Sequence, residues 1–196
     1  MGFGGAEAVL SDVNSIASNK RTAFQARLKN FQRLGLLRGV QEGRGRAARY
    51  QAHHLLWFAI AVEFGQLGLQ PEAAVAILRR SERKIAEAIK DAPASEAEAE
   101  GWSPQILYFD PVGLAPLMEP MDEADRHSFT FATPEEFTDD IYAWFAARRT
   151  RLAVVDIMGL VAKIAEALDR VPELQAMRPS YFFGQALWEW AKAECV

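Results

Sequence analysis

The segment from residue 20 to residue 50 carries a positive charge unlike that of any other part of the chain. It contains nine lysines and arginines and a single acid, Glu42, so its net charge is +8, whereas the whole chain of 196 residues has a net charge of −4. Apolar residues recur in its first half at intervals of four, three and three, which predicts a helix with one stripe for packing. The stripe consists of Phe24, Leu28, Phe31 and Leu34. Cationic and polar residues occupy most of the other faces, which favours binding to a polyanion such as nucleic acid.

A basic loop rich in glycine follows this predicted helix. Gly35 ends the helical pattern, and Gly39, Gly43 and Gly45 come within a few residues. The sequence GVQEGRGRAARYQ can form two short strands around residues 42–45, as in the wing of a winged helix. A basic helix can enter the major groove of DNA while such a hairpin reaches the neighbouring backbone.

A short amphipathic helix is predicted before the basic one, over residues 6–17. Ser18 and Asn19 then make a tight corner, and either Asn19 or Thr22 is suited to cap the basic helix. Two helices joined by so short a turn, the second of them cationic, indicate a helix-turn-helix.

The remaining pattern divides the chain into two predicted units. Residues 52–67 are apolar nearly all round, which predicts a buried helix, and a further helix is expected over residues 71–90. Residues 91–103 are small and acidic and predict a linker. Beyond it we expect strands at 106–110, 129–133 and 152–157 and helices at 134–148, 158–168 and 182–194. The predicted fold class is therefore mostly α with small β content: a winged helix-turn-helix domain (1–90), the linker, and a small α+β domain (104–196) for dimerisation or effector binding.

Charge and composition narrow the classes of function. Residues 1–90 have a net charge of +7 and residues 91–196 a net charge of −11, so the polyanion site is expected in the first unit. The chain has no run resembling a membrane span or a signal peptide, and we expect a cytoplasmic protein without a membrane partner. The only cysteine, Cys195, excludes an internal disulfide and a cysteine cluster for a metal. No metal or cofactor is expected.

The first 80 residues resemble the MerR-type DNA-binding domain. The resemblance rests on a constellation in order along the chain: Arg27-Leu28, Phe31, Gly35-Leu36-Leu37, Arg49-Tyr50, Leu55, Phe58, Gly68-Leu69, Glu72 and Ile77-Leu78. It implies a helix-turn-helix, a basic wing, a buried helix and a second helical pair. The sequence departs from the family at Asn30, where an aromatic residue is usual, and at the acidic segment, which stands where the family's long dimer helix would run. The resemblance therefore says nothing about dimer geometry or about residues 104–196.

The DNA contacts are predicted on the basic helix and loop. Arg21, Thr22, Gln25 and Arg27, early in the helix, are expected to read bases, and arginines of the loop to touch phosphate or the minor groove. The full predicted set is Lys20, Arg21, Thr22, Gln25, Arg27, Lys29, Arg33, Arg44, Arg46, Arg49 and Tyr50. A solvated cationic face is the alternative interpretation.

Other chemistry-bearing residues favour structural roles. Adjacent His53 and His54 lack a spaced third ligand and are interpreted as helix-start residues, and His127 as a loop residue. The acids Asp110, Asp139 and Asp140 could form paired carboxylates, but acidic charge near a helix start is the simpler explanation for the latter two. The aromatic residues of the second half favour a core or a dimer interface over a ligand pocket.

We therefore expect a sequence-specific transcriptional regulator that binds double-stranded DNA, acts as a homodimer and has no enzymatic activity. A repressor is favoured because activation in the MerR-type family works through the long dimer helix. A small-molecule or protein effector remains open at the second unit. The alternative is an architectural or excisionase-like accessory protein whose function is to bend DNA.

Overall fold

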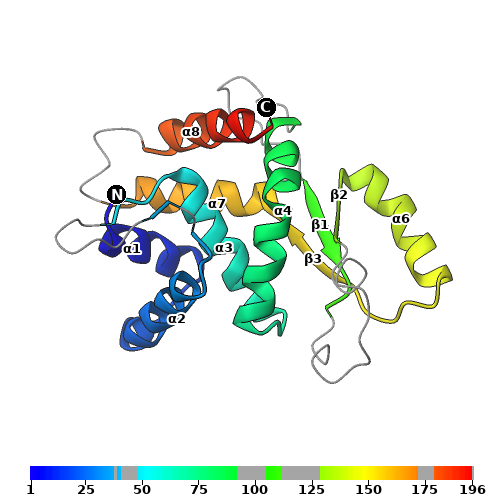
Figure 1. Cartoon of the computed structure of the whole chain (residues 1–196), viewed down its shortest axis with the longest axis horizontal. Coiled ribbons are helices and arrows are strands. Elements are labelled where there is room, and N and C mark those ends of the chain that lie inside the picture. Colours follow the sequence, from blue (N-terminus) through cyan, green and yellow to red (C-terminus); the bar gives the residue numbers. More distant parts are fainter. Residues whose placement is uncertain (38, 41–47, 92–104, 112–128, 172–178, 196) are drawn as a thin grey trace.

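The computed structural model describes residues 1–37, 39–40, 48–91, 105–111, 129–171 and 179–195 (Figure 1). This part of the chain is mostly helical with a small antiparallel sheet, as predicted. The helices are α1 (Phe3–Val13), α2 (Arg21–Arg33), α3 (Ala52–Gln66), α4 (Pro71–Asp91), α6 (Pro134–Ala146), α7 (Ile157–Asp169) and α8 (Pro179–Glu194). The strands are β1 (Ile106–Phe109), β2 (Phe129–Ala132) and β3 (Ala153–Asp156).

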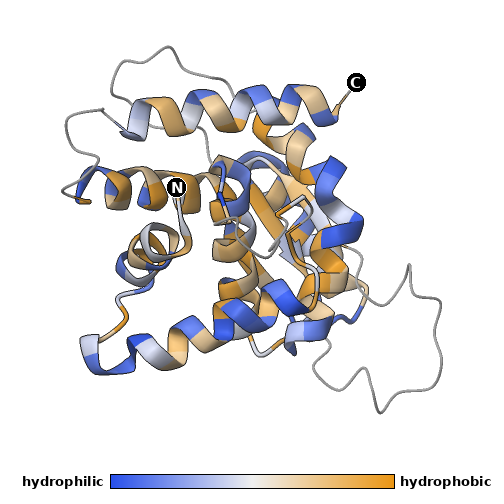
Figure 2. Cartoon of the chain, turned by 60° about the vertical axis from the view of Figure 1, so that its left-hand side comes forward, coloured by the Kyte–Doolittle hydropathy of each residue, from blue (hydrophilic) through white to orange (hydrophobic). Residues whose placement is uncertain are grey.

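Helix α3 lies in the middle of the core. Ten of its fifteen residues are buried, because it is apolar on every face and is surrounded by α1, α2, α4, α7 and α8. Figure 2 shows hydrophobic residues concentrated where these helices meet and hydrophilic residues on the outer faces. The buried helix predicted from the sequence is confirmed.

The sheet has the order β2-β1-β3, and both neighbours of β1 run antiparallel to it. Phe109 pairs with Phe129 of β2 and with Ala153 of β3, so these residues share one face, and that face packs on the main core. Tyr108 points to the opposite face, where it meets Trp144 of α6. The central strand is therefore covered on both faces, which explains its continuous apolar sequence.

Residues on both sides of the predicted linker share one hydrophobic core. Helix α1 packs on α7, and α4 packs on α8. A salt bridge of 2.7 Å joins Asp12 at the end of α1 to Arg170 just after α7. The predicted division at residues 91–103 therefore does not separate two cores, because apolar faces in the first ninety residues are covered by helices from the last forty. Residues 92–103 themselves lie outside the described residues.

The corner before α2 differs from the prediction. Ser18–Lys20 form a 3-10 turn, α2 begins at Arg21, and its N-cap Lys20 makes no side-chain cap hydrogen bond. The predicted caps Asn19 and Thr22 are therefore wrong, because the backbone bond from Lys20 N to Ala17 O shapes this corner instead. Residues 41–47 of the predicted wing (39–51) lie outside the described residues, and its described residues, 39–40 and 48–51, form no strand.

Candidate nucleic-acid interface

Helix α2 is held by its apolar stripe and turns the rest of its surface outward. Phe24, Leu28 and Phe31 are buried, as predicted, with at most 6% of each side chain exposed. The sequence of α2 contains no acid. We call the exposed residues of this helix, together with Lys20 just before it, the α2 outer face: Lys20, Thr22, Ala23, Ala26, Arg27, Lys29 and Arg33.

Small side chains lie along the first two turns of α2 on its outer face. Thr22, Ala26, Lys29 and Arg33 follow one another at intervals of four, three and four residues, so they form one ridge along the helix. Thr22, Ala26 and the neighbouring Ala23 leave the helix backbone close to the surface, and cations lie beyond them toward the end of α2. A bulky partner can therefore approach the helix closely while its charges meet lysine and arginine.

The cations of this face are not neutralised by acids. Within the described part of the chain, Lys20, Arg27, Lys29 and Arg33 have no carboxylate partner. Arg33 donates a hydrogen bond of 2.8 Å to Asn30, and the Lys29 ammonium lies 5.5 Å from the centre of the Phe3 ring. These contacts orient the two side chains but leave their positive charge in place.

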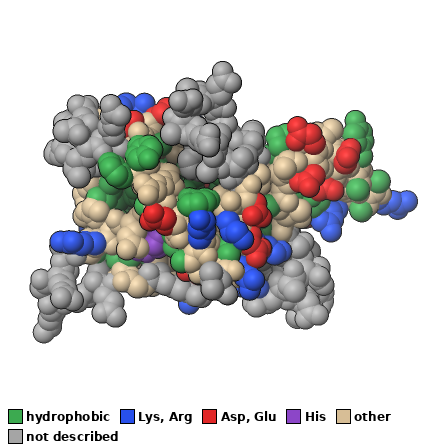
Figure 3. Space-filling model, turned by 90° about the horizontal axis from the view of Figure 1, so that it is seen from above, with side chains coloured by type: hydrophobic (Ala, Val, Ile, Leu, Met, Phe, Trp, Pro, Cys, Tyr) green, Lys and Arg blue, Asp and Glu red, His purple; other side chains and the backbone are tan. Residues whose placement is uncertain are grey.

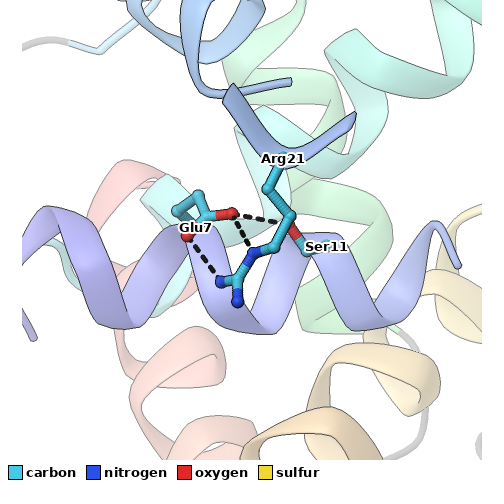
Figure 4. A network of polar contacts seen from close by, with 3 residues as sticks. All are labelled: Glu7, Ser11 and Arg21. Carbon is cyan, nitrogen blue, oxygen red and sulfur yellow. Dashed lines mark hydrogen bonds and ion pairs between the residues drawn. The ribbon is translucent and has the colours of Figure 1, made fainter. Parts of the chain in front are cut away.

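Arg21 forms an ion pair that the sequence did not predict. Its guanidinium donates from Nε to Oε1 of Glu7 at 2.9 Å and from Nη2 to Oε2 at 2.7 Å, and Ser11 donates to Oε1 at 2.8 Å (Figure 4). The Glu7 side chain is only 4% exposed. This bidentate pair ties α1 to the first turn of α2 and occupies the two Arg21 nitrogens that a base contact would use.

Glu7 is ionised in this arrangement. Burial alone would raise the pKa of its carboxyl, but the hydrogen bonds from Arg21, Ser11 and Gln25 together hold that pKa below its ordinary value of 4.5. Arg21 and Gln25, two of the four predicted base-reading residues, are half-buried. Thr22 and Arg27 are exposed, as base contact requires. The sequence did not reveal this pair because Glu7 lies fourteen residues before Arg21, in another helix.

Tyr50 lies in the core and not on the surface. Only 4% of it is exposed, its ring packs against Phe3 and Phe58, and its hydroxyl receives a hydrogen bond from Gln32. The structure therefore leaves little of the Tyr50 side chain available for the predicted DNA contact. Arg49 is exposed. Arg44 and Arg46 lie outside the described residues.

The residues considered for other chemistry are held in structural contacts. His54 accepts a hydrogen bond from the Gln51 backbone N–H at the start of α3, and Asp140 accepts one from the Tyr108 hydroxyl. Asp110 pairs with Arg151 at 3.0 Å. The described residues contain no group of three or more histidine, cysteine, aspartate or glutamate side chains arranged to hold a metal ion. His127 falls outside this part of the chain.

Comparisons with protein-family models, with curated proteins and with solved structures each gave no match. The helices of the described part of the chain are too short or too polar to cross a bilayer. The function of the α2 outer face is therefore inferred from its geometry and charge.

Proposed function

We propose that this protein binds double-stranded DNA through the α2 outer face and regulates transcription. One observation carries the proposal: a helix without any acid exposes a ridge of small side chains with cations that have no carboxylate partner in the described chain. Most charged surfaces mix both signs, whereas a surface for DNA must be positive over the width of the contact.

The dimensions of α2 suit the major groove. Its thirteen residues span roughly 20 Å, and the groove is about 12 Å wide, which admits one helix. Thr22, Ala23 and Ala26 would face the base edges, where small side chains permit close approach. Arg27, Lys29 and Arg33 would reach bases or phosphates along the groove walls.

The order of the helices supports a regulator of the MerR-like, helix-turn-helix class. A short helix, a basic helix, a buried helix and a further long helix follow one another in α1 to α4, which is the order that the family resemblance implies. Repression is the preferred activity because the chain has an acidic segment where the family's activating dimer helix would run.

Selection of binding sites from randomised duplexes tests this proposal, using the full chain at about 150 mM salt, where nonspecific phosphate binding is weak. We expect an enriched site, and an inverted repeat if two copies bind together. Failure to bind duplex DNA at any salt concentration would overturn the proposal. Binding without an enriched sequence, with strong bending of the duplex, would replace the regulator by the architectural alternative.

Variants assign the binding to α2. Lys29→Ala and Arg33→Ala should each weaken DNA binding and lower the slope of log affinity against log salt by about 0.9 for each phosphate that is no longer neutralised. Lys163→Ala removes an exposed lysine of α7 and is the matched control. Equal losses in all three variants would show that binding depends on total charge and not on this face.

A further inference from the structure

Helix α6 is much less buried than a helix of its length should be. Only Trp144 of its thirteen residues is buried, whereas α7, also of thirteen residues, buries seven. Short helices are marginal in water, and tertiary packing supplies most of their stability. Helix α6 therefore has most of its surface available for a further contact.

The attachment of α6 to the rest of the protein is confined to the outer face of the sheet. Trp144 and Phe137 pack on Tyr108 of β1, the Tyr108 hydroxyl donates to Asp140 at 2.5 Å, and the Trp144 indole N–H donates to the Arg151 carbonyl at 2.9 Å. These contacts form a small cluster separate from the main core. They fix one side of α6 and leave the other side uncovered, and Figure 1 shows the helix standing at the edge of the molecule.

The uncovered side carries a stripe of side chains suited to pairing with a helix. Glu135, Thr138, Tyr142 and Phe145 follow at intervals of three, four and three residues, which is the spacing of a seam between two helices. Tyr142 is 75% exposed and Phe145 50% exposed. Large aromatic side chains are enriched in protein interfaces, where their burial contributes much of the affinity.

The charges along α6 are polarised. Glu135, Glu136 and Asp139 lie in its first half, whereas Arg148 and Arg149 follow its last turn. Figure 3 shows acidic and apolar side chains together on the part of the molecule formed by α6, with cations at its tip. Within the described residues, no ion pair involves Glu135, Asp139 or Arg148.

We propose that a second copy of this chain packs on α6, with the two α6 helices antiparallel about a twofold axis near Tyr142. Antiparallel packing places the acidic first half of each helix beside the Arg148 end of its partner, whereas parallel packing would bring like charges together. The contact is self-complementary, as a twofold interface must be, because each copy offers the same stripe and both charges. This surface is independent of the α2 outer face.

The dimer should be concentration dependent. Two thirteen-residue helices bury less than the about 1,200–2,000 Å² of a standard interface. Sedimentation velocity of the full chain over a range of micromolar concentrations should show monomers converting to dimers. A single monomeric species throughout that range would overturn the proposal.

Paired aromatic variants locate the interface. Tyr142→Ser with Phe145→Ser should raise the dimer dissociation constant at least tenfold. The matched control is Tyr181→Ser with Phe182→Ser, because these aromatics of α8 are each 58% exposed and lie outside the proposed contact. A dimer that is weakened by the α8 pair and not by the α6 pair would place the interface elsewhere.

Charge reversal tests the antiparallel arrangement and does not depend on the aromatic variants. Glu135→Arg or Arg148→Glu alone should weaken self-association, since each brings like charges together twice in the dimer. An equimolar mixture of the two variants should form heterodimers about as well as the unmodified chain, because both contacts then join opposite charges. Recovery in the mixture cannot come from a folding defect, and its absence, with both variants folded by circular dichroism, would overturn the antiparallel arrangement.

Discussion

The imidazole of His53 stacks on the indole of Trp190, with ring centroids 5.1 Å apart and ring planes 13° apart. This contact joins the first turn of α3 to the last turns of α8. Burial against α8 and the neighbouring His54 lower the pKa of His53 to about 4. The stack therefore contains a neutral ring at neutral pH.

Stability should fall in mild acid because of His53. A histidine in the unfolded chain has a pKa of about 6.5, so between pH 6.5 and pH 4 the unfolded state binds a proton that the folded state resists. The stability that the neutral His53 contributes above pH 6.5 is therefore lost as the pH falls, by about 1–2 kcal/mol. This loss is smaller than the full pKa shift would imply, because part of the ring meets solvent. Urea unfolding of the chain and of His53→Gln at several pH values measures it. The difference between the two proteins should narrow as pH falls, and a constant difference would contradict this assignment.

Arg21 should contribute to stability more than any exposed cation of α2. Arg21→Ala leaves the Glu7 carboxylate, whose side chain is only 4% exposed, without its cation, so we expect a clear loss in the free energy of unfolding. Glu7→Gln keeps an acceptor for Ser11 and should cost less, about 1–2 kcal/mol. Arg27→Ala removes an exposed cation of the same helix and should change stability by less than about 0.5 kcal/mol. Equal effects of Arg21→Ala and Arg27→Ala in urea unfolding would contradict a structural role for the pair.

The start of α7 depends on a cap that also constrains its third residue. Asp156 accepts a hydrogen bond of 2.9 Å from the Gly159 backbone N–H, and a Cβ at position 159 would lie 2.5 Å from Oδ2 of Asp156. Asp156→Ala should therefore cost about 1 kcal/mol. Gly159→Ala should displace the carboxylate and cost a similar amount. The loss of stability of the double variant, measured by thermal unfolding, should be smaller than the sum of the two single losses, because both substitutions remove the same cap.

Leu187 of α8 tests the shared core. Its side chain is completely buried, so Leu187→Ala should cost about 2–5 kcal/mol. Because α8 packs on α3 and α4, the loss should destabilise the helices of the first ninety residues together with those of the last. Far-ultraviolet circular dichroism and tryptophan fluorescence should then give one coincident unfolding transition. Two separate transitions would instead support two independently folding units.

Local patterns predicted most elements of this fold correctly. The stripe Phe24, Leu28, Phe31 and Leu34 predicted α2, and the run that is apolar nearly all round predicted α3. The segments ILYFD, FTFAT and LAVVDI predicted the three strands. These signals are strong because each depends on residues close together in the sequence. The sequence analysis did not identify Thr133 and Asp156 as the caps of α6 and α7.

Contacts between distant residues were not predictable in the same way. Nothing near Arg21 indicates that its partner is Glu7, fourteen residues earlier on another helix. The basic residues of α2 look alike in the sequence, and only the folded structure shows that Arg21 pairs with Glu7 whereas Lys29 and Arg33 are exposed without a carboxylate partner in the described chain. The same limit applies to Tyr50, whose burial depends on rings of α1 and α3. The acidic segment suggested a domain boundary because no local sequence pattern shows that α7 packs on α1.

The packing of α1 against α7 also sets the order of events during synthesis. Asp12 and Arg170 are separated by 158 residues, so a growing chain can form α1, α2 and α3 long before the helices that cover them exist. At translation rates of about 5–20 residues per second, the apolar surfaces of α1, α3 and α4 remain uncovered for several seconds. The final fold is then reached only when the carboxyl-terminal helices leave the ribosome, and the nascent chain is exposed to chaperones and to aggregation until that moment.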